Sequence, residues 1–392
     1  MKARAIVVVC DGLGVGPAPD ADAFGDAGKK TLQHVLRDGR PAIPNLTHLG
    51  LLHTLYEDAP ASLPAPSGAF GRLAEVSAGK DTVTGHWELM ELPVDAPFPL
   101  YPDGFPPDLV SRFEAAIGRR VLGNKAASGT VILDELGEEH VATGRPILYT
   151  SGDSVFQIAA HEDVIPIEKL YEWCAIARAL LVPPHQVGRV IARPFVGPGK
   201  GRFTRTHWRK DFSVAPPSPT LLDRAKAAGR SVHALGKIED IFAGRGISSA
   251  IHTESNRDGI ERTIAALVAR DDDLVFTNLV DFDTKYGHRN DPRGYARCLE
   301  ELDVFLPALL GALREDDVLL FTADHGGDPS DVSTDHTREF VPVVAAGPGV
   351  RGGVDIGTRR TFADLGATVA EHLGLAPARG ESFLHAILPS SR

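Results

Sequence analysis

The sequence has few cysteines and no long hydrophobic run. Its 392 residues contain Cys10, Cys174 and Cys298, which are widely spaced and form no Cys-x-x-Cys pair. A disulfide framework is therefore not expected, and a reducing compartment suits the chain. The sequence lacks any stretch of about 18 apolar residues, and the apolar run near its start is too short for a secretory signal. We therefore expect a cytoplasmic protein that does not bind membranes.

An excess of positive charge is also missing. The formal net charge is −11, whereas the hydrophobic content of 43% and the charged content of 24% are ordinary for a globular protein. An acidic chain of this kind is not a general binder of nucleic acids or of anionic membranes. A phosphorylated small molecule remains a possible substrate, because one local basic patch would bind it.

Short apolar runs alternate with helical patterns along the chain. These runs occupy residues 5–10, 274–280, 318–323 and 341–347. The pattern predicts an α/β fold with a mostly parallel sheet that helices cover on both faces. Residues 97–215 are richer in proline and glycine and less regular, so they predict an inserted, smaller α/β cap domain. The core domain then comprises residues 1–96 and 216–392.

The glycines after the first strand do not form a dinucleotide-binding turn. Their spacing, Gly12-x-Gly14-x-Gly16, differs from Gly-x-Gly-x-x-Gly, and the prolines that follow hinder an immediate helix. We interpret the glycines as a tight exit from the strand that leaves Asp11 free to point into a site.

Two later segments, residues 280–288 and 322–337, concentrate carboxylates and imidazoles. They contain Asp281, Asp283, His288, Asp324, His325, Asp335 and His336. Ligands bind at the carboxyl ends of parallel strands, so these side chains are expected to converge with Asp11. Mixed oxygen and nitrogen sets suit Mn²⁺, Zn²⁺ or Fe²⁺, and so many ligands imply two ions. Two metals about 4 Å apart are typical of phosphoryl transfer.

A nucleophile for such a reaction lies in the turn at residues 77–90. Thr82 and Thr84 both belong to this polar, glycine-flanked segment. A hydroxyl beside metal ions can accept a phosphoryl group covalently. Either threonine can instead cap a helix, and the residues alone leave both interpretations open.

Taken together, these motifs resemble the alkaline phosphatase superfamily and, within it, the prokaryotic phosphopentomutases along nearly the whole chain. Further similar stretches are residues 18–26, 123–137, 149–162, 187–197 and 361–374. The resemblance implies an alkaline-phosphatase-like core and the interconversion of α-D-ribose 1-phosphate and D-ribose 5-phosphate, with the 2-deoxyribose forms also accepted. It further implies two Mn²⁺ ions, a phosphothreonine, a 1,5-bisphosphate intermediate and a primer such as glucose 1,6-bisphosphate.

The resemblance also implies a role for particular residues, with Thr82 as the phosphorylated nucleophile. One manganese ion would be held by Asp283, His288 and His336, and the other by Asp11, Thr82, Asp324 and His325. Asp281 and Asp335 would support these ligands or the local structure. The substrate contacts would be Ser151, Asp153, Arg189, Ile191, Arg209 and Lys237. Lys237 also follows an apolar strand, so the sequence pattern itself places it at the active edge.

A basic segment favours a mutase over a phosphatase. From Trp173 to Lys210 the chain has no Asp or Glu, but it carries Arg178, Arg189, Arg193, Lys200, Arg202, Arg205, Arg209 and Lys210. A basic cap domain suits an enzyme that holds a sugar phosphate and excludes water. The alternatives are a metal-dependent phosphatase or phosphodiesterase, a mutase of a related sugar phosphate, and a non-catalytic binding module. A metal-dependent phosphoglycerate mutase would have serine where Thr82 stands. We expect a monomer.

Four positions depart from the family's usual pattern. Gly12 stands in place of serine, Gly152 of alanine, Lys210 of histidine and Gly327 of asparagine. None of them is an expected metal ligand, so we expect the phosphoryl-transfer reaction to be retained. The sequence leaves open whether these positions alter the preferred pentose or primer.

Overall fold

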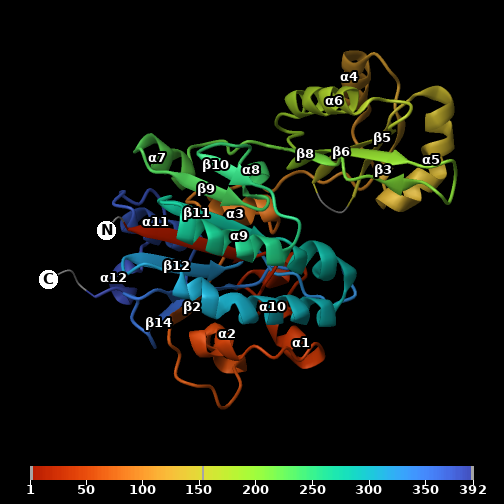
Figure 1. Cartoon of the computed structure of the whole chain (residues 1–392). Helices are drawn as coiled ribbons and strands as arrows, with labels where there is room; N and C mark the ends of the chain where they lie inside the picture. Colours follow the sequence, from red (N-terminus) through yellow and green to blue (C-terminus); the bar gives the residue numbers. More distant parts are fainter. Residues whose placement is uncertain (1–2, 152–153, 390–392) are drawn as a thin grey trace. The chain divides into compact units, whose positions relative to one another are not determined.

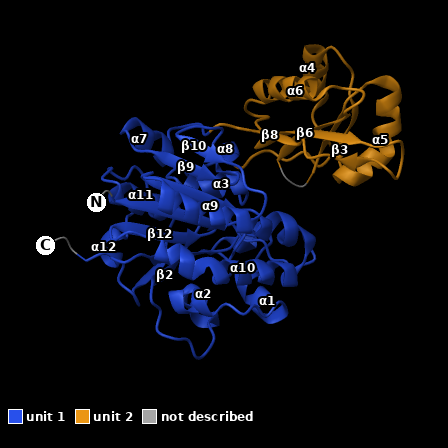
Figure 2. Ribbon diagram, in the orientation of Figure 1, with its two compact units in different colours: residues 1–96, 216–392 blue, residues 97–215 orange. Residues whose placement is uncertain are grey.

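The computed structural model describes residues 3–151 and 154–389. The chain forms two compact units, Met1–Ala96 with Pro216–Arg392 as unit 1 and Pro97–Ala215 as unit 2 (Figure 2). Unit 2 interrupts unit 1 in the sequence. That it serves as a substrate-binding cap stays a prediction. Within the described residues, no helix is both long enough and apolar enough to cross a membrane.

Unit 1 is built on an eight-stranded sheet (Figure 1). In spatial order its strands are β10 (Ser249–Ile251), β9 (Val232–Leu235), β11 (Leu274–Leu279), β1 (Arg4–Cys10), β12 (Asp317–Thr322), β13 (Val341–Ala346), β2 (Ala69–Leu73) and β14 (Asp355–Arg359). The first five run parallel, while β13 is antiparallel to both of its neighbours. Strands β1, β11 and β12 are buried at every residue, which explains why they are mostly apolar. The predicted mostly parallel α/β fold is confirmed.

Helices complete the layers of unit 1. They are α1 (Thr31–Asp38), α2 (Pro44–Leu49), α3 (Thr82–Leu89), α7 (Leu221–Ala227), α8 (Ile238–Ile241), α9 (Asn256–Ala269), α10 (Pro292–Gly311), α11 (Ala363–His372) and α12 (Leu384–Ile387). Helix α10 packs on α1, α2 and α9, whereas α11 packs on α3, α7 and α12. Helix α9 also contacts β11, and α11 contacts β1. The helices that contact the sheet therefore form two groups, one around α10 and one around α11.

Unit 2 has a six-stranded mixed sheet with helices of its own. The strands are β3 (Leu122–Ala126), β4 (Ile147–Thr150), β5 (Val155–His161), β6 (Arg189–Val196) and β7 (Thr204–Arg205), with β8 (Lys210–Ser213) also paired to β6. The helices are α4 (Pro107–Ile117), α5 (Gly129–Thr143) and α6 (Ile167–Leu180). Two apolar clusters hold the unit together, one with α4 and α6 and the other with α5.

Candidate metal centre and nucleophile

The first group of ligand atoms lies where two neighbouring strands of unit 1 end. Asp11 follows β1, and Asp324 and His325 follow β12, its parallel neighbour. All three side chains are buried, and their ligand atoms lie within 4.8 Å of one another. His325 Nε2 is 3.3 Å from Asp11 Oδ1 and 3.4 Å from Asp324 Oδ2. The parallel register of the strands therefore creates this group.

The second group combines residues from two loops. Asp283 and His288 lie in the helical turns after β11, and His336 lies in the segment between β12 and β13. Asp283 carboxylate oxygens are 3.2 Å from His288 Nε2 and 3.7 Å from His336 Nε2. The rings of His325 and His336 stack with their centroids 3.8 Å apart, so the two groups adjoin. The second group contains the three residues expected to hold one ion, and the first contains those expected to hold the other except Thr82.

Hydrogen bonds to carbonyl oxygens fix the orientation of two of these histidines. His288 Nδ1 lies 2.6 Å from the carbonyl oxygen of Thr334, and His325 Nδ1 lies 2.9 Å from that of Gly326. A carbonyl only accepts, so each Nδ1–H donates and the Nε2 lone pair faces the carboxylates. This is the tautomer that binds a metal through Nε2.

The donor set fits divalent cations. Asp11 Oδ1 is buried and accepts no hydrogen bond from a described residue. Burial alone would lower the pKa of His325, but Asp324 and Asp11 raise it well above its usual value. Burial likewise opposes ionisation of Asp283, yet His288 and His336 keep its pKa below the usual range. Three buried carboxylates side by side are costly without positive charge, which a metal ion supplies.

The structure distinguishes the two threonines at the start of α3. Asp81 is the N-cap, and its Oδ1 accepts hydrogen bonds from the backbone of Val83 and Thr84. The Thr84 hydroxyl donates to the carbonyl oxygen of Asp81 at 3.0 Å, and it accepts from the Asp81 backbone N–H at 3.4 Å, which completes a capping box. The Thr82 hydroxyl instead lies 3.2 Å from His325 Nε2. Thr82 therefore faces the metal groups, whereas Thr84 holds the helix end.

Two buried polar residues that the sequence reasoning missed support the ligands. His86 Nδ1 is 2.8 Å from the carbonyl oxygen of Thr82 and 3.1 Å from Asp324 Oδ2. Asn278 Nδ2 donates to Asp11 Oδ2 at 3.1 Å. Asn278 is a polar residue in a mostly apolar buried strand, and this exception in the sequence indicated a functional position. Such contacts restrict how the ligand carboxylates can turn.

Gly85 allows α3 to pack directly against the backbone of the metal-binding segment. A Cβ atom on Gly85 would lie 2.0 Å from the carbonyl oxygen of Asp324, so no side chain fits there. We expect Gly85→Ala to displace Thr82 from Asp324 and to lower kcat by about 100-fold, the cost of a shift of about 1 Å. Steady-state kinetics and circular dichroism together would measure this effect.

Gly311 provides the control, because it is also a helical glycine, the last residue of α10, but the space around it is open: no heavy atom outside its own helix turn lies within 4 Å of its Cβ position among the described residues. Gly311→Ala should leave kcat unchanged and stabilise the fold by about 0.5 kcal/mol. A Gly85→Ala enzyme with the unaltered kcat would contradict the packing argument.

The other expected site residues fall into both units. In unit 1, Lys237 follows β9, so it lies at the same sheet edge as the metal groups. Asp281 accepts a hydrogen bond from the backbone of Asn256 at the start of α9, and Asp335 is exposed. Neither carboxylate belongs to a group of candidate ligands. The role of Lys237 as a substrate contact stays a prediction.

In unit 2, Arg189 and Ile191 lie on β6, and Ser151 directly follows β4. Asp211 accepts two hydrogen bonds of 2.7 Å from Arg209 and lies 3.6 Å from Arg189, so one carboxylate positions both arginines. Asp153 and Gly152 lie outside the described residues. The Lys210 ammonium lies 5.1 Å from the centre of the Tyr171 ring, in contact with α6.

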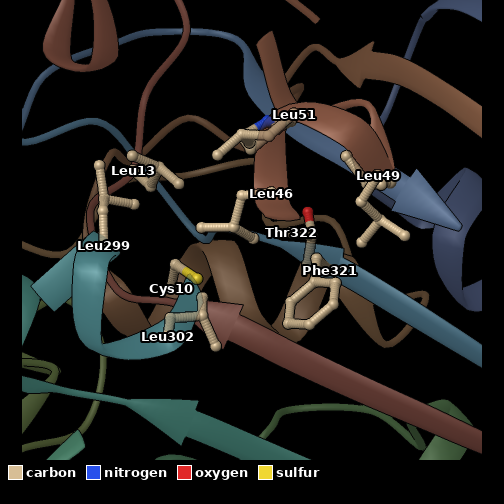
Figure 3. A pocket seen from close by; sticks show the side chains of 11 residues that line it. Cys10, Leu13, Leu46, Leu49, Leu51, Leu299, Leu302, Phe321 and Thr322 are labelled. Carbon is tan, nitrogen blue, oxygen red and sulfur yellow. The ribbon is translucent and has the colours of Figure 1, made fainter. Parts of the chain in front are cut away.

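A small pocket of unit 1 is lined by residues at the ends of β1 and β12 and by neighbouring helices (Figure 3). It is lined by Cys10, Leu13, Leu46, Leu49, Leu51, Leu299, Leu302, Phe321, Thr322, Pro342 and Val344. Burial raises the pKa of the Cys10 thiol far above its usual value, so the thiol is neutral. An apolar lining of this kind does not suit a charged ligand, and the pocket is a packing gap rather than a substrate site.

The fold and the two ligand groups are those of a metalloenzyme, and a sequence model of the Metalloenzyme superfamily matches residues 3–377. Phosphopentomutase of Alkaliphilus metalliredigens is 54% identical over 98% of this chain and 99% of its own. Phosphopentomutase of Acetivibrio thermocellus is 53% identical over 98% and 100%. The PH0037 protein of Pyrococcus horikoshii shares the fold, with a TM-score of 0.51, 16% identity and coverage of 97% and 99%. The chain belongs to the phosphopentomutase family.

Membership at this identity over the full length carries the family's activity. The protein is an enzyme, a phosphopentomutase, which uses divalent metal ions and acts on a sugar phosphate.

Proposed function

We propose that this enzyme interconverts α-D-ribose 1-phosphate and D-ribose 5-phosphate, and the 2-deoxyribose forms, through a phosphorylated Thr82 and a 1,5-bisphosphate intermediate. The observation that carries the proposal is the position of the Thr82 hydroxyl, 3.2 Å from His325 Nε2 at the edge of the ligand groups. The identity of the relatives supports the pentose as the sugar.

The chain's own residues account for the handling of the phosphoryl group. Asp81 caps α3 so that Thr82 stands at the first helical position, where backbone N–H groups and the helix dipole favour an anion. His86 Nδ1 contacts both the carbonyl oxygen of Thr82 and the carboxylate of Asp324. His86 therefore keeps the nucleophile at a fixed distance from that carboxylate. A phosphoryl group on Thr82 would therefore form beside the N–H donors of a helix start, and the proposed metal ions would supply the positive charge.

Two Mn²⁺ ions, one held by Asp11, Thr82, Asp324 and His325 and one by Asp283, His288 and His336, would lower the pKa of the Thr82 hydroxyl and neutralise the transferring group. The transfer balances in two steps. The P–O bond to Thr82 breaks as one forms to the free hydroxyl of the pentose monophosphate. In the second step the P–O bond between the sugar and its other phosphoryl group breaks as that group bonds to Thr82, and the freed sugar oxygen takes up the proton that the first hydroxyl lost. Glucose 1,6-bisphosphate would prime the enzyme by phosphorylating Thr82 first.

Ser151, Asp153, Arg189, Ile191, Arg209 and Lys237 are proposed to bind the sugar phosphate. Arg189 and Arg209 are held by Asp211 and would present guanidinium groups suited to phosphate oxygens. The cytoplasmic location and the monomeric state expected from the sequence stay predictions.

The test is ³¹P NMR of the purified enzyme with ribose 1-phosphate, Mn²⁺ and a trace of glucose 1,6-bisphosphate. We expect the signal of ribose 5-phosphate to replace that of ribose 1-phosphate without release of inorganic phosphate. Parallel samples with Zn²⁺ or Mg²⁺ should react more slowly. Stoichiometric inorganic phosphate would show a phosphatase and overturn the relay through Thr82.

A further inference from the structure

The residues that follow His325 and His336 pair with each other. Gly326 and Thr337 form an isolated antiparallel bridge, in which each backbone N–H donates to the carbonyl oxygen of the other residue, at 3.0 and 2.8 Å. Because Gly326 follows His325 and Thr337 follows His336, this bridge holds the two stacked histidines side by side. The two metal groups therefore adjoin because of a backbone contact outside either group.

The carboxylate of Glu339 lies against this bridge. A Cβ atom on Gly326 would be 2.6 Å from Glu339 Oε1, and one on Gly14, in the loop after β1, would overlap Glu339 Oε2. Two glycine backbones therefore leave room for one carboxylate. Glu339 is only 1% exposed, and among the described residues it forms no ion pair with a lysine, arginine or histidine. A buried carboxylate without a cation depends on hydrogen-bond donors for its stability.

Four donors surround the Glu339 carboxylate. Its Oε1 accepts from the hydroxyls of Thr31 at 2.6 Å and Thr337 at 2.7 Å. Its Oε2 accepts from the backbone N–H groups of Thr31 at 2.9 Å and Gly16 at 3.0 Å. The Thr31 hydroxyl in turn accepts from the backbone N–H of Gly327 at 3.1 Å. Glu339 thereby joins the loop after β1, the start of α1 and the segment after β12.

Two of the segments that Glu339 joins supply ligands to both metal groups. The loop after β1 begins at Asp11, and the segment after β12 contains Asp324, His325 and His336. The hydrogen bonds of Glu339 go to none of these side chains, so Glu339 acts on them through the backbone. Groups behind the ligands of a metal ion restrict how those ligands are placed and thereby change the affinity for the ion.

We propose that Glu339 is a positioning residue that holds the two metal groups at a fixed spacing through Thr31, Thr337 and the bridge to Gly326. A carboxylate suits this place because both of its oxygens only accept, and all four neighbours donate. An amide would present N–H groups to one pair of donors, so buried donors would lose their acceptor. The proposal depends on the binding of divalent metal ions and is independent of the relay through Thr82.

The test is a titration of Mn²⁺ into the full-length protein after removal of metal by a chelator, followed by electron paramagnetic resonance. Free Mn²⁺ gives a sharp spectrum, whereas two bound ions close together broaden it through coupling of their spins. We expect the wild-type protein to bind two Mn²⁺ ions with a coupled spectrum. Glu339→Gln should weaken the affinity for Mn²⁺ by about tenfold, as is typical for loss of support behind metal ligands, and should reduce the coupled signal.

Thr31→Val tests the same connection with a smaller change. It removes the hydroxyl between Gly327 and Glu339 but keeps the size and branching of the side chain, so the fold should be retained. We expect weaker Mn²⁺ binding in Thr31→Val, and binding like that of the wild type in Thr31→Ser, which keeps the hydroxyl. If Glu339→Gln does not fold, as judged by circular dichroism, this pair of variants decides the question.

Asp303→Asn is the matched control for a purely structural effect. Asp303 is also a buried carboxylate without an ion pair among the described residues, and it accepts from the backbone of Leu46 at 2.7 Å and from Asn45 Nδ2 at 3.0 Å. It connects α10 to α2 and belongs to none of the segments that Glu339 joins. Asp303→Asn should lower the free energy of unfolding and leave the Mn²⁺ titration unchanged.

Several outcomes would overturn the role of Glu339. These are unaltered Mn²⁺ affinity and coupling in a folded Glu339→Gln, an equal loss of affinity in Asp303→Asn, and equal binding by Thr31→Val and Thr31→Ser. A wild-type spectrum without coupling would also refute the fixed spacing. An enzyme that releases phosphate in the ³¹P experiment, yet loses Mn²⁺ affinity in Glu339→Gln as expected, would refute the proposed function and retain the role of Glu339.

Discussion

Alanine in place of Thr82 will abolish phosphoryl transfer while leaving the fold intact. The Thr82 hydroxyl is the one that faces His325, whereas the Thr84 hydroxyl is engaged by Asp81. Loss of a covalent nucleophile removes the reaction path itself, so we expect kcat to fall by about 10⁴-fold or more. The rate of conversion of ribose 1-phosphate, followed by ³¹P NMR, measures the effect.

Intact-protein mass spectrometry provides a second readout. The wild-type enzyme treated with glucose 1,6-bisphosphate should gain the mass of one phosphoryl group, and Thr82→Ala should not. Thr82→Ser is the matched control, because it retains a hydroxyl at the same position and should retain measurable activity. Substantial activity in Thr82→Ala, or phosphorylation of that variant, would exclude Thr82 as the nucleophile.

Replacing Arg338 with methionine will strongly destabilise unit 1. The guanidinium of Arg338 is buried and lies 2.7 Å from the carboxylate of Glu75. It also donates to the carbonyl oxygens of Glu75, Ser77 and Gly79 and to the carboxylate of Asp20. Burial and Glu88 raise the pKa of Glu75, and Arg338 is the cation that opposes this. Methionine would leave a buried carboxylate unpaired, which costs about 3–5 kcal/mol.

Equilibrium urea unfolding of the metal-loaded enzyme would measure this loss. The double variant Arg338→Met with Glu75→Met should recover part of it, because both members of the buried pair are then apolar. Arg297→Met provides the surface control, since the Arg297 guanidinium is exposed and lies 3.7 Å from Asp291. A loss in Arg338→Met no larger than in Arg297→Met would contradict the argument.

The sequence indicated that the candidate ligands Asp11 and Asp324 would converge, because their convergence depends on a simple rule of strand direction. Asp11 and Asp324 each follow an apolar strand, and parallel neighbours deliver such residues to one edge. The choice between Thr82 and Thr84 was not accessible in this way. It depends on which hydroxyl the capping box of Asp81 engages, and both threonines fit a helix start by composition.

Contacts across elements were the other features that sequence reasoning missed. His86 reaches Asp324 because Gly85 lets α3 approach the backbone closely, and Asn278 reaches Asp11 across neighbouring strands. The pairing of Asp211 with Arg189 and Arg209 likewise follows from the position of β8 beside β6. A single sequence shows which residues are near along the chain, and these partners become near only after folding.

The position of β1 in the sheet has a consequence for the order in which the enzyme matures. β1 precedes the other described strands in the chain, yet its neighbours in the sheet are β11 and β12, which are made much later. Unit 2 is complete in sequence by Ala215, so it can fold during synthesis while β1 still waits for its partners. Asp11 and Asp324 meet only when β12 has been translated. The nascent chain therefore cannot bring the first group of candidate ligands together before β12 has been made.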